Sequence, residues 1–484
     1  MTVAIILFFL FTLFISWIGK KIGDKKTSIY LLSGWLVKCF AGMLFIYAYT
    51  YYYGNGKLVE DSGAYITEAK KLADIKSKKS SDFYSILFNS ENSEDLIANY
   101  FKDEPRSRIS RTKTGINDTR NHIKTIAVLM LIVGQDKTAI FLIYFFLSFL
   151  GFAILWLSIK NKVGISDFWT FSLILLTPSL LFWTSSNLKE APFMAGLCLV
   201  LAFFFSNRIK LKIWFLLIGV ILLTLFKPVL LVVIFTPWLL ITFIQKIVLE
   251  KKWLFGFPLI IMASLLFIFS IPKKSIKTIS DQQFDFINLA RGGIQVKGDT
   301  SFYFISSANE KNILIKDSIV IIEKSTPAIS NLFGKIRNEQ NVTLKPNSEQ
   351  LELVLYQKEG GSYFEISPIN NSWLSFLKAV PEAVFNSFFR PLPFDQKLSV
   401  LNLIFFLENL FFILLLFLIF KNWKDTPKPF YSLTLTCLIS VFSLAILIGI
   451  TTPASGALVR YRIPIQLLII IVYLMTKLKH ERSI

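Results

Sequence analysis

Long apolar runs separated by short polar segments dominate the hydropathy pattern of this chain. About 20 apolar residues are needed for a helix to cross a bilayer, and about eleven runs approach that length. The predicted spans are 2–19, 29–52, 138–159, 167–186, 189–207, 212–227, 229–246, 253–272, 398–420, 429–451 and 463–477. The pattern therefore predicts an all-α polytopic membrane bundle with about 11 transmembrane helices.

Lysine and arginine residues are concentrated in alternate short segments between these runs. The six segments are 20–26, 160–162, 208–212, 246–252, 421–428 and 477–482. All six lie on one side if the N-terminus is outside and the C-terminus inside, as the positive-inside rule requires. Because these segments account for much of the formal net charge of +20, we expect membrane lipids as partners and no nucleic acid.

Two long segments fall on the predicted outer side, 53–137 and 273–397. Residues 301–306, 312–322, 351–356 and 362–366 are rich in β-branched and aromatic residues, with a predicted hairpin turn at 358–361 and a helix at 374–389. This indicates a small α+β or β-rich domain, inserted late in the chain. The expected division is two spans (1–52), an outer loop (53–137), six spans (138–272), the outer domain (273–397) and three spans with a basic tail (398–484).

The outer loop also shows helical patterns. Residues 123–133 are too short to cross a membrane and too apolar to be free, which indicates an interfacial or re-entrant helix. Apolar residues at helical spacing in 65–73 predict a second helix, with Asp61 or Ser62 as its cap.

Glu60 and Asp61 stand at the start of this loop, close to the predicted membrane surface. A carboxylate there accepts a proton from a hydroxyl group or holds a divalent metal against a phosphate. The alternative is a solvated acidic loop, because further acids follow at Asp74, Asp82 and Glu94.

Basic residues on the predicted outer side are contrary to the positive-inside rule and therefore require an explanation. The outer loop carries Arg106, Arg108, Arg111, Lys113, Arg120 and Lys124. Guanidinium groups bind phosphate oxygens in a bidentate manner, so a lipid-linked phosphate is one candidate ligand. Binding to anionic headgroups and simple solvation are the alternatives.

Three other outer positions carry charges that suit a substrate. Arg460, Tyr461 and Arg462 enter the last span as an anion clamp or, alternatively, as an interfacial anchor. The tight turn 182–190, which ends in Lys189 and Glu190, lines a cavity or is a turn whose polar groups satisfy one another. Arg390 stands where the chain returns to the membrane.

Charged residues within or beside spans are a further class of candidates, since such groups face a cavity or a partner. They are Lys38, Lys227 and Glu408. The chain has no nucleotide-binding Gly-rich loop with Lys-Ser/Thr and no serine nucleophile elbow. With three cysteines in apolar runs and two histidines, a disulfide framework and a zinc site are not expected.

Some of these residues resemble a known family. An outer loop that opens with Asp61 and Tyr65, together with 178–190 (PSLLFWTSSNLKE), 389–394 (FRPLPF) and 456–464 (GALVRYRIP), resembles bacterial membrane glycosyltransferases of the GT-C class and O-antigen-polymerase-type proteins. The resemblance implies a polysaccharide-cluster enzyme of the bacterial inner membrane, active on its outer face. It transfers a sugar from a polyprenyl-phosphate-linked donor to a glycan or lipid acceptor.

The same resemblance implies residue roles. Asp61, with Glu60 beside it, is the general base or a ligand of a divalent cation such as Mg or Mn. Arg460 and Arg462 hold the lipid phosphate that leaves. Three alternatives stay open: a polymerase or ligase of lipid-linked glycans, a transporter or flippase for such glycans, and a structural subunit of an envelope complex.

Overall fold

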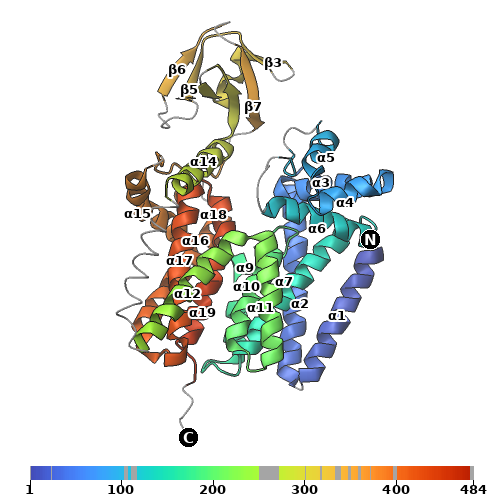
Figure 1. Ribbon diagram of the computed structural model, residues 1–484, viewed down its shortest axis with the longest axis vertical. Helices are drawn as coiled ribbons and strands as arrows, with labels where there is room; N and C mark the ends of the chain where they lie inside the picture. Colours follow the sequence, from blue (N-terminus) through green and yellow to red (C-terminus); the bar gives the residue numbers. More distant parts are fainter. Residues whose placement is uncertain are drawn as a thin grey trace. The chain divides into compact units, whose positions relative to one another are not determined.

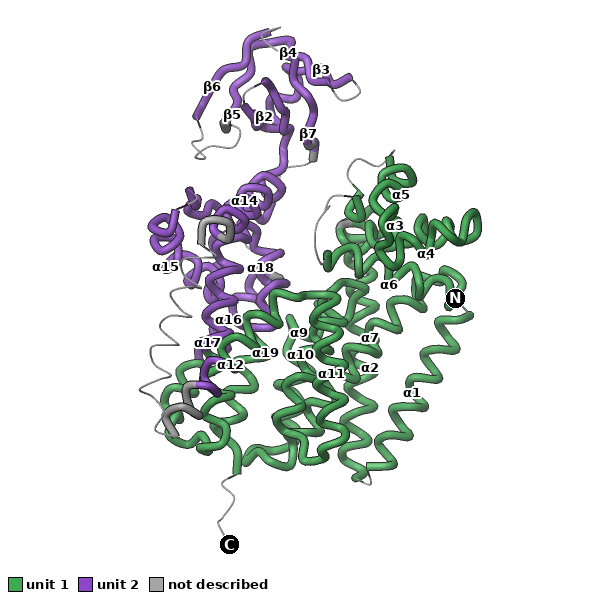
Figure 2. Tube along the Cα trace, in the orientation of Figure 1, with its two compact units in different colours: residues 1–239, 415–438, 466–484 green, residues 240–414, 439–465 purple. Residues whose placement is uncertain are grey.

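The structure is a computed structural model, and its elements are mostly helical, with one small antiparallel sheet (Figure 1). It describes residues 2–22, 24–102, 107–110, 117–249, 272–299, 301–316, 319–332, 340–346, 350–357, 361–370, 372–395 and 400–479. The chain divides into two compact units, shown in Figure 2. Unit 1 comprises 1–239, 415–438 and 466–484, and unit 2 comprises 240–414 and 439–465.

Unit 1 is built from helices. They are α1 (Thr2–Ile22), α2 (Lys25–Tyr47) with the π-helical turn Ala48–Tyr52, α3 (Glu60–Lys78), α4 (Ser80–Leu87), α5 (Ser93–Tyr100), α6 (Asp118–Val133), α7 (Lys137–Ile159), α8 (Asp167–Leu175), α9 (Pro178–Thr184), α10 (Glu190–Phe205) and α11 (Ile209–Phe226). Parts of α12 (Pro228–Leu249), α16 (Val400–Lys421), α17 (Tyr431–Thr451) and α19 (Ile463–Met475) belong to it as well.

Six helices among the described residues are long and apolar enough to cross a membrane. A seventh span forms if α18 (Ser455–Tyr461) and α19, which bend by 44° at their junction, cross together. The other predicted spans differ: α10 and the apolar part of α12 are short, and 167–186 is broken into α8 and α9. The span at 253–272 lies almost wholly outside the described residues, so the count of eleven stays a prediction.

Five of the six basic segments meet at one end of unit 1. Lys160 forms an ion pair with Asp24 (3.5 Å), and the backbone N–H of Lys479 donates to the carbonyl of Lys162 (2.9 Å). The rings of Phe205 and Phe430 stack with centroids 5.5 Å apart. These contacts agree with the alternation of the loop charges. Which face of a membrane this end meets stays a prediction.

The other end of unit 1 carries α3, α4, α5 and α6 (Figure 1). The predicted apolar face of α3 is confirmed, since Tyr65, Ala69 and Leu72 are buried. Residues 123–133 form the larger part of α6, which packs against α3, α7 and α11. The predicted cap is wrong: α3 begins at Glu60 after the extended Val59, with no side-chain cap.

Unit 2 contains a seven-stranded antiparallel sheet in the order β3-β4-β7-β1-β2-β5-β6. The strands are β1 (Gly293–Lys297), β2 (Ser301–Ile305), β3 (Ile313–Lys316), β4 (Ile319–Ile322), β5 (Thr326–Leu332), β6 (Gln340–Leu344) and β7 (Leu351–Gln357). Their alternating apolar residues form one buried cluster that includes Ile294, Val296, Ile305 and Val320. The strands predicted at 301–306 and 351–356 are thus confirmed, whereas the stretch predicted at 312–322 forms two strands, β3 and β4, that pair with each other.

The strand predicted at 362–366 is wrong. Tyr363 forms only an isolated bridge with Ala454, and the backbone N–H of Phe364 donates to the carbonyl of Pro453. This segment therefore packs against the chain before α18 and adds no strand to the sheet. The hairpin turn predicted at 358–361 lies mostly outside the described residues.

Helices complete unit 2. The helix predicted at 374–389 is confirmed as α15 (Trp373–Phe389). The buried side chain of Gln283 on α14 (Pro272–Arg291) donates to the carbonyls of Ser367 and Ile450 and accepts from the N–H of Ile369. One amide thus fixes α14 to the segment that follows the sheet and to α17.

Candidate functional site

Asp61 lies in the first turn of α3, where the helix N-terminus favours a negative charge. Both the Nε and the Nη2 groups of Arg108 donate to its Oδ1 atom, at 3.1 and 2.8 Å. The two side chains are 31% and 29% exposed, so the pair lies at the surface of unit 1 and stays accessible to a ligand. The Arg108 guanidinium also lies 5.7 Å from the ring centroid of Tyr65.

Glu68, which lies on the same face of α3 as Asp61, holds Arg108 in place. Its buried carboxylate accepts hydrogen bonds from the Ser107 hydroxyl (3.1 Å) and from the backbone N–H groups of Arg108 and Ile109 (2.9 Å each). Three donors on one carboxylate fix the turn that carries the arginine. Glu68 is thus a positioning residue for the Asp61–Arg108 pair.

A buried polar junction joins α3 to the turn between α9 and α10. The hydroxyl of Ser62 donates to Oδ1 of Asn187, and Nδ2 of Asn187 donates to the Ser62 carbonyl (3.1 Å). Nε2 of His122 lies 2.8 Å from the Asn187 carbonyl and Nδ1 lies 3.4 Å from the Tyr144 hydroxyl. The carbonyl oxygen can only accept, so Nε2 of His122 is the donor in this contact.

Lys189 and Asp118 form a second ion pair (3.0 Å), to which the Thr119 hydroxyl adds a contact with Lys189 of 3.0 Å. Burial raises the pKa of Asp118, but attraction by Lys189 and Lys227 and hydrogen bonds to the carboxylate leave this pKa below its usual range. Lys189 and Lys227 thus both act on one carboxylate. Glu190, which is 2% exposed, begins α10 directly after this pair.

The predicted basic cluster of the outer loop is only partly brought together. Arg120 is tied to the carboxylate of Glu94 and to the carbonyl of Ile109. Lys124 donates to Oδ1 of Asn89 (2.6 Å). Arg120 and Lys124 thus bind protein groups. Within the described residues, Arg108 is the arginine of this cluster that is partly exposed. Arg106, Arg111 and Lys113 lie outside them, as does the side chain of Glu60.

Unit 2 holds the remaining predicted arginines. Arg390 is fixed by Asp395 (2.8 Å), by Oδ1 of Asn386 (2.9 Å) and by the ring of Phe364, 4.2 Å from its guanidinium. Its carbonyl accepts from Nη1 of Arg462 at 2.7 Å. These contacts engage the Arg390 guanidinium, and its carbonyl helps to position Arg462; that Arg390 binds substrate stays a prediction.

Arg462 is 3% exposed, and its Nε and Nη2 groups have no hydrogen-bond partner in the part of the chain that the structure describes. The same holds for Nδ2 of the buried Asn386, which contacts Arg390. Buried donors without acceptors are costly, and a charged donor most of all. The three unsatisfied donors near Arg390 would be satisfied by an anion bound there. Arg460, by contrast, is half-buried, with Tyr461 beneath its guanidinium at 5.6 Å.

The buried lysine in α2 belongs to the interior of unit 1. Lys38 donates to the hydroxyl of Thr184, the last residue of α9, and lies 5.4 Å from the ring centroid of Phe152. The C-terminus of a helix favours a positive charge. Lys38 therefore stabilises the break between α9 and α10. Glu408 is buried in unit 2, where its charge attracts Arg462.

No group of three or more His, Cys, Asp or Glu side chains that could hold a metal ion occurs among the described residues. A hard divalent cation at Asp61 would need oxygens from elsewhere, such as phosphate oxygens and waters. That chemistry is compatible with Mg²⁺, which is often bound by one or two carboxylates together with substrate phosphates.

Sequence reasoning missed Glu68 and His122, and it named Asn187 only as part of the turn 182–190. Glu68 left a signal, because it is an acid on the apolar face of the α3 pattern. His122 begins the apolar stretch of α6, which is a weaker signal of the same kind. Nothing in the pattern around Asn187 separates it from an ordinary turn residue.

Comparison of the chain with protein-family models, with curated proteins and with solved structures finds no match.

Proposed function

We propose that this chain is an integral membrane glycosyltransferase that moves a sugar from a polyprenyl-phosphate-linked donor to a glycan or lipid acceptor at the extracytoplasmic face of a bacterial inner membrane. Asp61 acts as the general base. The resemblance of the Asp61–Tyr65 opening to GT-C enzymes motivates the proposal, and the geometry around Asp61 supports it.

One observation carries the proposal: Asp61 is a partly exposed carboxylate that a guanidinium orients through one oxygen. Arg108 contacts Oδ1 twice, and Glu68 fixes Arg108 from behind. A base must be accessible and held in one orientation, because misplacement by about 1 Å costs about 100-fold in rate. Three other carboxylates of this region, those of Glu68, Glu94 and Asp118, serve protein contacts instead.

In this mechanism the acceptor hydroxyl gives its proton to Asp61 while its oxygen attacks the anomeric carbon of the donor sugar. The bond between that carbon and the phosphate oxygen breaks, and polyprenyl phosphate leaves with the bonding electron pair. Negative charge grows on the departing phosphate. Cationic groups that face it lower the barrier, since such groups act most strongly where charge develops.

Candidates for the phosphate contact in the same unit as Asp61 are Arg108, Lys189 and Lys227. Arg460 and Arg462, to which the resemblance assigns the lipid phosphate, lie in unit 2, where Arg462 has two donors without partners among the described residues. A divalent cation bound through Asp61 and phosphate oxygens would supply Lewis-acid stabilisation of the same charge.

A second candidate function is a polymerase or ligase of lipid-linked glycans. The buried guanidinium of Arg462 favours it, because in such an enzyme the phosphate contact carries more of the catalysis than a base does. The two functions differ in which substitution is worse: Asp61→Asn for the transferase, Arg462→Ala for the polymerase.

The test is transfer by the full-length protein in lipid nanodiscs, with a panel of synthetic undecaprenyl-phosphate-linked sugars and release of undecaprenyl phosphate as the readout. Asp61→Asn keeps the size of the side chain and removes the base. We expect its rate to fall by about 10²–10⁴-fold, the contribution typical of general base catalysis. Asp74→Asn, on the same helix, is the matched control and should retain the wild-type rate.

A rate for Asp61→Asn within a few-fold of wild type would show that Asp61 is not the base. Rates that fall further for Arg462→Ala than for Asp61→Asn would favour the polymerase or ligase. Absence of release from every donor in the panel, with the protein folded, would contradict the transferase.

A further inference from the structure

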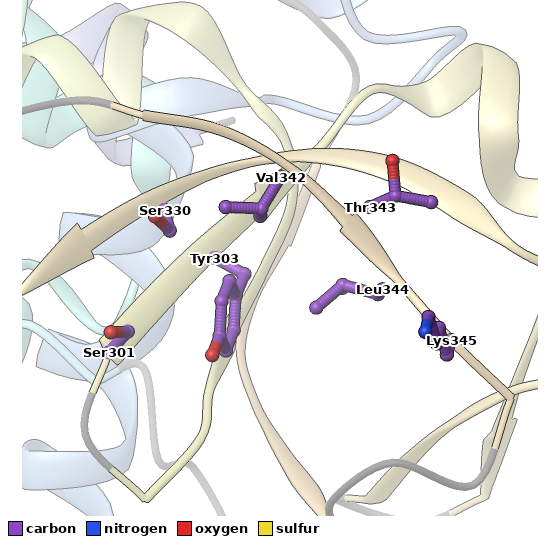
Figure 3. Close-up of a pocket in the computed structure, with 7 residues that line it drawn as sticks. All are labelled: Ser301, Tyr303, Ser330, Val342, Thr343, Leu344 and Lys345. Carbon is purple, nitrogen blue, oxygen red and sulfur yellow. The ribbon is translucent and has the colours of Figure 1, made fainter.

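Apolar side chains reach the surface of unit 2 in two different settings. In the sheet, Tyr303 and Val342 line a small hollow and pack against the buried core of the domain (Figure 3). On α15, four large apolar side chains are between 43% and 64% exposed: Trp373, Leu374, Leu377 and Phe385. Apolar side chains gathered on one exposed face commonly mark a contact with a partner or a membrane.

The exposed and buried residues of α15 occupy opposite sides of the helix. The buried ones are Ala379, Ala383, Asn386 and Ser387. Ala379 and Ala383 pack in one apolar cluster with Ile450 near the end of α17. Because a helix has about 3.6 residues per turn, the four buried positions share one side and the exposed apolar ones share the other. α15 thus packs on unit 2 with one face and presents a second, apolar face to its surroundings.

Two charged residues lie along the border between these faces. Glu382 accepts hydrogen bonds from the backbone N–H of Ser367, at 3.1 and 3.3 Å. Lys378 is exposed in the N-terminal half of α15. A lysine at a membrane surface extends its ammonium group to the headgroups while its methylene groups stay in apolar surroundings. Both charges are therefore compatible with lipid on the apolar face.

Contacts with α17 show how deep α15 lies. A Cβ atom at Gly449 would lie 2.0 Å from the carbonyl oxygen of Ala383, so the backbone of α15 rests directly on α17. One turn further along α15, the hydroxyl of Ser387 donates to the carbonyl of Ala445 (2.6 Å). α15 therefore runs along α17 from the end of that helix towards its interior. Ala445 precedes Thr451, the last residue of α17, by six positions, or about 9 Å along the axis.

α16 gives the same depth independently. Nδ2 of Asn409 donates to the carbonyls of Phe389 (3.0 Å) and Arg390 (3.1 Å) at the end of α15. Asn409 lies seven residues inside the apolar stretch Asn402–Lys421, or about 10 Å from its start. α16 and α17 are each long and apolar enough to cross a membrane, and one leaflet has about 15 Å of hydrocarbon. The C-terminal end of α15 is thus level with the hydrocarbon beside these helices.

The apolar face of α15 also continues into the surface of the spanning helices. The ring of Phe388 lies 6.0 Å from that of Phe442 on α17, which is itself 39% exposed. α16 exposes Leu407, Leu410 and Leu414. Exposed apolar side chains on a spanning helix face lipid, because a helix that is apolar all round is stable outside a protein core only in a bilayer. The same lipid is therefore the partner that fits α15.

We propose that the exposed face of α15 binds the acyl chains of membrane lipids, so that α15 is inserted partway into one leaflet beside α16 and α17. Trp373 then lies near the headgroups, where tryptophan is enriched in membrane proteins, and Phe385 lies deeper. This contact with lipid is independent of the proposed transfer reaction.

The test is electron paramagnetic resonance of the full-length protein in nanodiscs of phosphatidylethanolamine and phosphatidylglycerol. A nitroxide label is attached at Leu374→Cys, Leu377→Cys or Phe385→Cys, and its collisions with oxygen and with an anionic chromium chelate are measured. Oxygen dissolves in hydrocarbon, whereas a charged chelate is excluded from it. The three native cysteines are buried, and the unsubstituted protein gives the background signal.

We expect the ratio of oxygen to chelate collisions to rise from Leu374→Cys through Leu377→Cys to Phe385→Cys. At Phe385→Cys it should exceed the ratio at Lys316→Cys, an exposed position of β3, by about tenfold, because charge is costly in hydrocarbon. Leu414→Cys, exposed on α16, is the reference for a position that faces lipid and should give a similarly high ratio.

Two results would overturn the proposal. Ratios at Leu377→Cys and Phe385→Cys equal to that at Lys316→Cys would place the face in water. Labels that neither reagent reaches would show that protein covers the face. Leu377 is 59% exposed, so Leu377→Cys alone decides between these outcomes if Phe385→Cys does not fold.

Discussion

Two charged regions of this protein differ in how many of their charged groups have partners among the described residues. In unit 1, Asp61 meets Arg108, Asp118 meets Lys189, and the buried carboxylate of Glu68 accepts three hydrogen bonds. In unit 2, the guanidinium of Arg462 is buried and makes one hydrogen bond, to the carbonyl of Arg390.

The region in unit 1 is therefore preorganised, whereas the region in unit 2 has donors that suit an anionic ligand. The network of unit 1 satisfies its own charges and so holds Asp61 in one orientation before any substrate arrives. Arg462 carries two donors without an acceptor among the described residues, even though the charge of the buried Glu408 attracts it. A phosphate is the natural compensation, since guanidinium binds phosphate in a bidentate manner.

Removing the support behind Asp61 should have the largest effect on stability. Glu68→Ala leaves the Ser107 hydroxyl and the N–H groups of Arg108 and Ile109 without their acceptor. We expect a loss of about 3–4 kcal/mol in the free energy of unfolding, as for other broken buried charge networks. Thermal unfolding in detergent measures it, with Asp74→Ala on the same helix costing less than about 1 kcal/mol. Equal losses would mean that Glu68 supports nothing.

The buried cation Lys124 should make the stability of the protein depend on pH. Burial, reinforced by repulsion from Arg120, lowers the pKa of Lys124 to about 8, against about 10.4 in an unfolded chain. Between these values the unfolded state binds more protons, so stability should rise with pH from about 8 to 10.4, by about 2–3 kcal/mol. Lys124→Met should remove the rise, and the exposed Lys70→Met should preserve it. A flat profile in the wild type would place Lys124 in contact with water.

The buried guanidinium of Arg462 should contribute to the binding of a lipid phosphate. Arg462→Met removes the buried charge, and we expect the affinity for undecaprenyl phosphate to fall about tenfold, or about 1.4 kcal/mol. The melting temperature in the absence of lipid should fall as well, because the substitution removes the hydrogen bond to the Arg390 carbonyl and the attraction that the buried Glu408 receives. Microscale thermophoresis in detergent gives the affinity, with Arg460→Met as the control. An Arg460→Met variant that is more impaired than Arg462→Met would reverse the assignment.

Sequence reasoning succeeded where local pattern decides structure. The long apolar runs, the strands at 301–306 and 351–356 and the helix at 374–389 follow from periodicity and composition alone. It failed at 362–366, whose β-branched and aromatic residues were read as a strand although they pack against the chain before α18. Tertiary packing overrode local propensity there.

Only part of the candidate site could be predicted, because local pattern does not show which residues far apart in the sequence meet. Asp61 was singled out because an acid at a membrane boundary is unusual, but its partner Arg108 lies 47 residues away and was one of six similar cations. Only the fold distinguishes the arginine that reaches Asp61 from Arg120, which is tied to Glu94. Arg462 was found from the sequence as a possible phosphate clamp, whereas its burial and missing partners depend on packing around Arg390.

A structure of the full-length protein in nanodiscs with undecaprenyl phosphate added would show whether Arg462 holds a lipid phosphate. We expect phosphate density within hydrogen-bonding distance of the Nε and Nη2 groups of Arg462. Density that avoids Arg462 and collects instead around the basic segments of unit 1 would contradict this assignment.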